Sequence, residues 1–286
     1  PTFGYQSRLE LGGDDDRKDN DLPEKERMRP RDDPQAITEN LLGGTSDRID
    51  FEIIMSTSPE QIAIAPGYLQ REWEEDGRRY FHYKMDVPIL NFYSMVSAEY
   101  EIISDKWSDG NQDVNLEIYY HKGHDYNVDN MLKSMKKSLD YFTTNFSPYQ
   151  YRQLRIMEFP RYRSFAQSFS NTVPFSEDIG FMLDVGKEDV DIPFYVTAHE
   201  IAHQWWAHQV TEADVQGNAM SSETMSQYSA LMVMKQEFKP EIIQKFLELE
   251  LDRYLRGRAT ESKKEQPLDH VEGQGYIHYR TGSLIM

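Results

Sequence analysis

The sequence predicts an α+β fold in which a β-rich N-terminal portion precedes a mainly helical part. Between residues 48 and 122, short segments alternate apolar and polar residues and are separated by Gly, Asn and Asp, a pattern typical of antiparallel strands. Beyond this region, apolar residues recur at three- and four-residue steps, which indicates amphipathic helices. We therefore expect a partial β-rich domain with a charged leading segment at residues 1–122, and a second domain at residues 123–286.

The β-rich portion follows a leading segment, residues 8–50, that is charged and has no clear period. We expect this segment to be loop, with one helical turn near residues 34–42. The strands expected after it lie in five segments, IDFEIIMSTS, QIAIAPG, RYFHYKMDV, FYSMVSAEYEIISDKW and VNLEIYYHKG.

The second part is expected to begin with a helix over residues 127–146 and a strand over residues 151–159. Residues 164–185 are expected to form one or two strands around a turn at Pro174. The final letters, TGSLIM, stop in an apolar stretch without a capping or turn signal, so we expect a fragment that was cut within a helix. Further helices are expected at three places, residues 193–208, 221–238 and 240–256.

The composition excludes several classes of protein and site. The 286 residues carry a formal net charge of −18, which argues against binding to nucleic acid or to an anionic membrane surface. The absence of cysteine excludes a disulfide framework, a thiolate zinc site and a cysteine nucleophile. No apolar run is long enough to span a bilayer, and the first residues do not form a signal peptide. The cellular compartment stays open.

The clearest chemical signal is VTAHEIAHQWW, in which His199 and His203 stand four residues apart on an expected helix. This spacing puts both imidazoles on one helix face, where they can bind one tetrahedral zinc ion. Glu200, next to the first histidine, is placed to take a proton from a zinc-bound water. The alternative interpretation is a pair of histidines that only form hydrogen bonds on a partly buried helix.

A hydrolytic zinc site usually has three protein ligands and one position open to water. Glu223 begins the next expected helix, and an antiparallel helix pair would return it to the first helix. It is otherwise only a first-turn glutamate favoured by the helix dipole. His208 is a rival ligand, but it lies about 140° around the helix from His203, so we interpret it as a residue near the metal or on the surface. The remaining histidines are interpreted as ordinary polar residues: His82, His121, His124, His270 and His278.

These residues resemble the aminopeptidase N family of zinc peptidases, which are gluzincins. HEIAHQWW and SETMSQYSALM are similar to the family's HExxH motif and to the glutamate on its next helix. Between His203 and Glu223 lie 19 residues, one more than is usual in that family. The resemblance implies one zinc ion per chain, bound by His199, His203 and Glu223, with Glu200 as the general base.

Two further segments are similar to motifs of the family. IHYRTGSL resembles its tyrosine segment, which implies that Tyr279 hydrogen-bonds the oxyanion; Gly282 also matches. PFSED takes the place of the family's GxMEN strand, with Glu177 at the position that holds the substrate's free amino group, although the glycine and the amide of the motif are missing. Tyr228 matches a tyrosine often found after the third ligand.

The resemblance spans residues 48–286. It implies the end of a β-sandwich or saddle domain, followed by a thermolysin-like zinc peptidase domain that is truncated on its C-terminal side. It also implies a zinc metallopeptidase of the aminopeptidase type, with peptides as substrates. The motifs are most similar to those of bacterial peptidase domains attached to ABC-type permeases, so a membrane-permease portion is expected in the full-length protein.

Two other functions compete with a peptidase. The first is a zinc-binding pseudo-peptidase that binds or senses peptides for an attached transporter, which the altered GxMEN segment favours. The second is a structural domain without metal, whose β region contacts other proteins. Zinc content and peptide cleavage distinguish the three.

Overall fold

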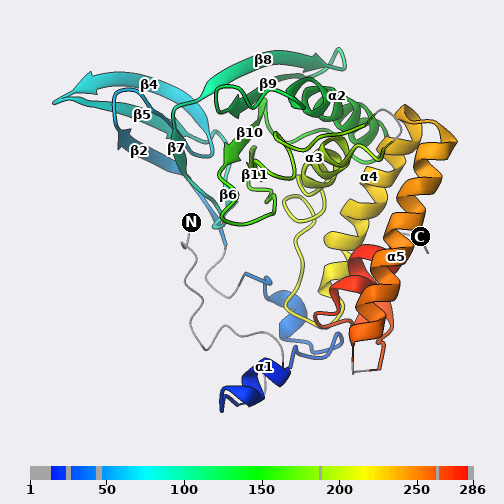
Figure 1. Ribbon diagram of the computed structural model, residues 1–286. Coiled ribbons are helices and arrows are strands. Elements are labelled where there is room, and N and C mark those ends of the chain that lie inside the picture. Colours follow the sequence, from blue (N-terminus) through cyan, green and yellow to red (C-terminus); the bar gives the residue numbers. More distant parts are fainter. Residues whose placement is uncertain (1–13, 24–26, 43–46, 187–188, 262–263, 283–286) are drawn as a thin grey trace.

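The computed structural model describes residues 14–23, 27–42, 47–186, 189–261 and 264–282. Its N-terminal part is rich in strands and its C-terminal part is rich in helices, as predicted for the α+β class (Figure 1). The leading segment contains a short helix, α1 (Asp14–Asp19), and a 3₁₀ turn at Ala36–Thr38, where one helical turn was expected.

The first strands form three small antiparallel sheets. One has three strands in the order β2-β5-β4, and the others are the pairs β1–β6 and β3–β7. The β4–β5 hairpin turns at Asp76 and Gly77, whose φ angles of 49° and 71° suit a type I′ turn. The strands are β1 (Arg48–Ile49), β2 (Glu52–Thr57), β3 (Ile62–Ile64), β4 (Tyr68–Glu75), β5 (Arg78–Lys84), β6 (Ile89–Leu90) and β7 (Val96–Ala98).

A fourth sheet, of mixed type, has the strand order β11-β10-β9-β8. β8 and β9 are antiparallel, but β9, β10 and β11 run parallel, which the sequence did not predict. The crossover helix α2 explains this, because it returns the chain so that β10 runs in the direction of β9. The sheet thus joins strands from both sides of residue 122, and the domain boundary expected there stays a prediction. The elements are β8 (Glu101–Ser108), β9 (Asp113–Tyr120), α2 (Val128–Asn145), β10 (Gln153–Phe159) and β11 (Thr172–Ser176).

Helices follow β11 and pack in sequence. α3 lies against α2 and against α4, and α5 packs beside the last described segment (Figure 1). Buried apolar side chains of the strands, of α2 and of α3 to α5 form one continuous core, so the helices are anchored on the sheet. The helices are α3 (Ile192–Ala202), α4 (Glu223–Glu237), α5 (Pro240–Thr260) and a π-helical segment at Tyr276–Thr281.

Two sequence predictions were wrong in detail. The helix predicted over residues 193–208 ends at Ala202, where backbone bonds shift to the three-residue spacing of a 3₁₀ turn, and Ala207 has a φ of 153° that no helix accommodates. The turn predicted at Pro174 lies instead at Asn171, whose φ is 52°, while Pro174 is inside β11. Asparagine tolerates this left-handed conformation better than most residues do.

The leading segment packs against the helical part. The backbone of Arg29 accepts a hydrogen bond from Gln216 N (2.8 Å), and its guanidinium pairs with Asp214 (3.1 Å). Arg27 pairs with Glu272 (2.6 Å), near the π-helical segment. Residues near the start of the chain therefore lie beside those that follow α3. No helix among the described residues is long and apolar enough to cross a membrane.

Candidate metal centre

The first turn of α3 sets the orientation of the helix that carries the HExxH residues. The Asp191 side chain caps the helix by accepting a hydrogen bond from Phe194 N (2.9 Å), and Pro193 occupies the first turn, where its missing N–H costs nothing. Apolar residues bury the rest of the helix. His199 and Glu200 lie on its last turn and are almost fully buried.

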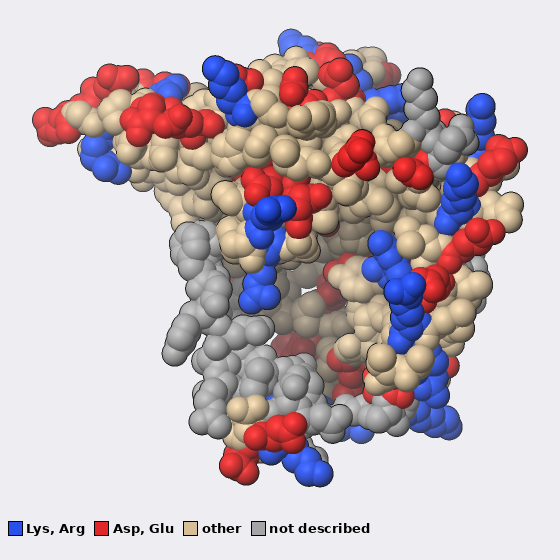
Figure 2. Space-filling model, in the orientation of Figure 1, with Lys and Arg blue, Asp and Glu red and all other residues tan. Residues whose placement is uncertain are grey.

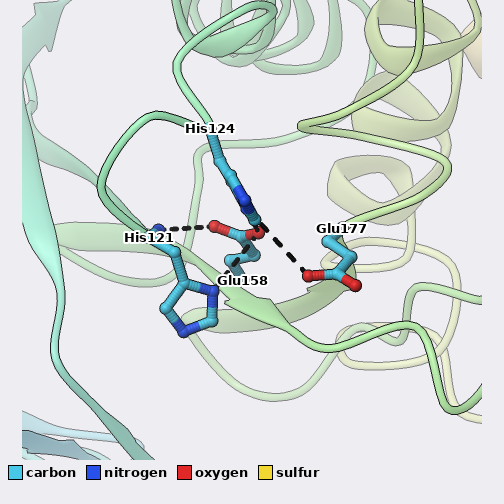
Figure 3. A group of neighbouring side chains, drawn as sticks. All are labelled: His121, His124, Glu158 and Glu177. Carbon is cyan, nitrogen blue, oxygen red and sulfur yellow. Dashed lines mark hydrogen bonds and ion pairs between the residues drawn. The ribbon is translucent and has the colours of Figure 1, made fainter.

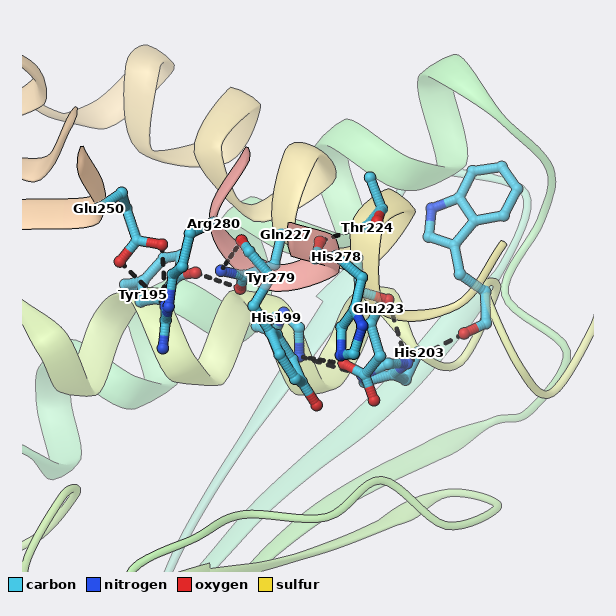
Figure 4. Close-up of polar contacts among 12 residues, drawn as sticks. Tyr195, His199, His203, Glu223, Thr224, Gln227, Glu250, His278, Tyr279 and Arg280 are labelled. Carbon is cyan, nitrogen blue, oxygen red and sulfur yellow. Dashed lines mark hydrogen bonds and ion pairs between the residues drawn. The ribbon is translucent and has the colours of Figure 1, made fainter. Parts of the chain in front are cut away.

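His199, His203 and Glu223 converge on one point (Figure 4). Glu223 Oε2 lies 3.4 Å from Nε2 of each histidine, and the two Nε2 atoms are 3.1 Å apart. A tetrahedral zinc ion with bonds of about 2.0–2.2 Å holds its ligand atoms about 3.3–3.6 Å apart. The three side chains therefore already have the spacing that a zinc ion requires, and they leave a fourth position open.

Glu223 is the first residue of α4, and its charge suits metal binding. Burial raises the pKa of a carboxyl group, but at Glu223 the contacts with His199 and His203 outweigh burial and hold the pKa well below its usual range. The carboxylate thus stays ionised at neutral pH, as a zinc ligand must.

The second histidine is oriented by groups behind it. His203 Nδ1 lies 3.0 Å from Trp206 O and 3.1 Å from Ser226 Oγ. Donation from Nδ1 to the carbonyl fixes the tautomer in which Nε2 carries the lone pair that a metal needs. The turn after α3 therefore has a role in the site, because it supplies this carbonyl.

Glu200 lies next to the ligands without contributing to the cluster. Burial raises its pKa to about 7, and the negative charge of Glu223 adds to the effect. Its Oε2 atom is buried and has no hydrogen-bond partner among the described residues. A carboxylate that ionises near neutral pH, with one oxygen uncommitted, has the properties of a general base.

Tyr279 reaches the centre from the last described segment. Its ring centroid is 6.2 Å from that of His199, and Figure 4 shows its side chain beside His199 and Glu223. Burial and the charge of Glu223 both raise the pKa of Tyr279, so the phenol keeps its proton and can donate a hydrogen bond.

Contacts with two helices fix the segment that carries Tyr279. On α4, Thr224 Oγ1 donates to His278 O (2.8 Å) and Gln227 Nε2 donates to Tyr279 O (3.1 Å). On α5, the fully buried carboxylate of Glu250 pairs with Arg280 at 2.8 and 3.0 Å. These bonds hold the tyrosine on both sides (Figure 4).

Two other residues singled out from the sequence, His208 and Glu177, do not belong to the three-ligand cluster. His208 is 3% exposed and its Nε2 lies 3.3 Å from Ser168 O, so it is buried rather than on the surface, and burial lowers its pKa to about 4. Glu177 follows β11 and, among the described residues, groups with His121, His124 and Glu158 instead of with the three ligands. His121 and His124 were expected to be ordinary polar residues and Glu158 was not expected to have a role, although the HKGH segment at the end of a strand is a signal of metal-binding side chains.

Comparison with solved structures identifies the fold. The crystal structure of the M1 zinc metallopeptidase from Deinococcus radiodurans matches with a TM-score of 0.63 over 84% of this chain, at 18% sequence identity. A mutant form of that peptidase bound to a Tyr-Ser-Ala substrate, and a two-domain form bound to L-arginine, match equally well. The fold is that of M1 zinc metallopeptidases.

The chain spans about half the length of those structures, 52% in the first case. No protein-family model matches the sequence, and no curated protein gave a match. The likeness therefore concerns the fold alone.

One residue near the centre gives a pH-dependent stability that can be measured. Burial raises the pKa of Glu212 to about 7, so the folded protein keeps a proton that the unfolded chain loses above about pH 4. The stabilisation is full below that pH and is lost as the pH rises through about 7. In metal-free protein, Glu212→Gln should equal the parent near pH 4.5 and exceed it by about 3 kcal/mol at pH 8, as measured by urea unfolding. A difference that is the same at both pH values would contradict this assignment.

Proposed function

We propose that this protein is a zinc-dependent peptidase that hydrolyses peptide bonds at the His199, His203 and Glu223 centre. The observation that carries the proposal is the spacing of the three ligand atoms, 3.1 to 3.4 Å, which suits one tetrahedral zinc ion with an open fourth position. When bound there, zinc would lower the pKa of a water molecule toward about 7 and polarise the scissile carbonyl.

The chain's own residues supply the proton transfers and the oxyanion contact. Glu200 takes a proton from the attacking water and later delivers it to the leaving amine nitrogen. Its free Oε2 and its pKa of about 7 support both steps. The Tyr279 hydroxyl donates a hydrogen bond to the oxyanion as the carbonyl carbon becomes tetrahedral.

We further infer an aminopeptidase, in which Glu177 takes the substrate's free amino group. The carboxylate of Glu177 is 19% exposed, so a substrate can reach it. Figure 2 shows a hollow between the β-rich part and the helices, with acidic side chains inside it, and such a surface attracts a cationic N-terminus.

The domain organisation and the composition of the full-length protein are also proposals. We infer that residues 1–122 are the end of a β-sandwich or saddle domain and that residues 123–286 are the first part of a thermolysin-like domain. The resemblance of the motifs to permease-attached peptidases supports a membrane-permease portion elsewhere in the protein, with peptide processing linked to transport.

The test uses protein loaded with one zinc ion per chain and a matched pair of peptides, one with a free N-terminus and one acetylated. Mass spectrometry should show stepwise loss of N-terminal residues from the free peptide only, and 1,10-phenanthroline should stop the reaction. Cleavage of both peptides would retain the peptidase and reject the aminopeptidase. Binding of peptide without any product would favour the non-catalytic, peptide-sensing alternative.

A further inference from the structure

A second group of metal-binding side chains lies at the carboxyl ends of three parallel strands (Figure 3). His121 and His124 follow β9, Glu158 is near the end of β10, and Glu177 follows β11. Parallel strands end at the same edge of a sheet, which is where ligands bind in open α/β sheets. Four residues from distant parts of the chain are thus brought together by the sheet.

The ligand atoms of this group are close together. Glu158 Oε1 lies 2.5 Å from His124 Nδ1 and 3.3 Å from His121 Nδ1. Glu177 Oε2 lies 4.0 Å from His124 Nδ1. The first centre shows the same arrangement, in which one carboxylate oxygen faces a nitrogen of each of two imidazoles. In each group, one bound cation could take the place of the direct contacts between the imidazole nitrogens and the carboxylate oxygen.

The burial of the Glu158 carboxylate favours cation binding by this group. Its side chain is fully buried, and its second oxygen accepts a hydrogen bond from His121 N (2.5 Å). A buried carboxylate is costly unless positive charge lies beside it. The two imidazoles are about a quarter exposed, so an ion can reach the group from solvent.

The backbone of the HKGH turn directs both histidine side chains toward Glu158. His124 N donates to His121 O (2.9 Å), and Gly123 has a φ of 83°, which favours glycine. The two rings meet edge to face with centroids 5.8 Å apart, and both Nδ1 atoms face the same carboxylate. The tight turn, and not a helix, sets this geometry.

We propose that His121, His124, Glu158 and Glu177 form a second metal centre, which takes a divalent first-row cation such as Zn²⁺. Two imidazoles and two carboxylates suit this class of ion better than they suit Ca²⁺ or Mg²⁺, which prefer oxygen ligands alone. Binding requires the His124–Glu158 contact to open from 2.5 Å, and the His124–Glu177 contact to close from 4.0 Å, toward about 3.3 Å.

The number of ligands indicates what this centre does. The first centre offers three protein ligands and an open position, whereas the second offers four, which closes a tetrahedral shell. A closed site is structural. It ties the turn between β9 and α2 to the ends of β10 and β11, and it uses the Glu177 carboxylate that an aminopeptidase would need for its substrate. Glu177 can therefore hold the amino group of a substrate, as inferred under the proposed function, only while this second centre is empty.

Zinc stoichiometry tests the proposal. The full chain, purified without a metal-affinity tag, is stripped with chelator, reloaded with Zn²⁺, gel-filtered and analysed by elemental mass spectrometry. We expect about two zinc ions per chain in the parent and about one in the variant His121→Ala/His124→Ala. The variant His199→Ala/His203→Ala should also keep about one ion, and a chain with all four substitutions should keep none. His82→Ala is the matched control, because His82 pairs with Glu52 (2.7 Å) but belongs to no group of three candidate ligands among the described residues.

Each outcome separates the two centres. If His199→Ala/His203→Ala removes all zinc and His121→Ala/His124→Ala removes none, the second centre does not exist and the proposed peptidase site stands. If His121→Ala/His124→Ala removes all zinc and His199→Ala/His203→Ala removes none, the proposed peptidase site is rejected and the second centre is supported. Should His121→Ala/His124→Ala not fold, Co²⁺ added to His199→Ala/His203→Ala protein decides: visible absorption of tetrahedral cobalt supports the second centre, and its absence overturns it.

Discussion

Replacing Glu200 by glutamine is expected to lower kcat by about 10²–10⁴-fold while leaving the zinc content of the protein unchanged. Glutamine has nearly the same volume as glutamate, but it cannot accept a proton from the attacking water. Glu200 is 6% exposed and is not one of the three converging ligands, so neither packing nor metal binding should suffer. Steady-state kinetics on a peptide substrate and elemental analysis of the same sample provide the measurement.

The control for this variant is Glu52→Gln, which makes the same chemical change on strand β2, in a residue that pairs with His82 and Lys84. Its kcat should equal that of the parent. Near-normal turnover by Glu200→Gln protein would rule out Glu200 as the general base and would leave the metal ligands unaffected. Loss of zinc in that variant would instead mean that Glu200 supports the metal centre.

Replacing Tyr279 by phenylalanine is expected to lower kcat by about 10²–10³-fold with little change in KM. The hydroxyl is proposed to contact the oxyanion, which forms only as the reaction proceeds, so its loss affects the transition state more than substrate binding. The ring and the bonds that hold its backbone to Gln227 remain. Comparison of kcat and KM for the two proteins at equal zinc content gives the result.

Tyr276→Phe is a matched control, because Tyr276 lies three residues earlier in the same π-helical segment and packs against Gly257 of α5. That variant should retain full activity. Equal losses in both variants would indicate that the segment had been disturbed as a whole, and a rise in KM alone for Tyr279→Phe would assign the hydroxyl to substrate binding.

The parts of the site that the sequence predicted are those that lie close together in the chain. His199, Glu200 and His203 share one helical turn, so a four-residue step was enough to put both imidazoles on one face. Glu223 begins the next long helix, as expected, and the spacing of the three ligand atoms supports the predicted centre. The roles of Glu200 and Tyr279 remain predictions.

The parts that the sequence did not predict depend on long-range pairing. Alternating apolar residues indicate a strand but not the direction of its neighbour, so the parallel arrangement of β9, β10 and β11 was missed. That arrangement is what brings His121 and His124 to Glu158, more than 30 residues away. The early end of α3 at Ala202 was missed for another reason, since no glycine or proline marks it.

The attachment of the Tyr279 segment has a consequence for synthesis of the protein. The metal ligands lie within residues 199–223, whereas the bond that fastens the tyrosine segment to α4 joins residues 54 positions apart. Under the proposed function, a chain emerging from the ribosome therefore contains all three zinc ligands before it contains the tyrosine that contacts the oxyanion. The segment then has to dock on Thr224, Gln227 and Glu250, which lie on helices made earlier. The chain can thus bind the metal before it is active, and proteolytic activity requires that this segment has docked.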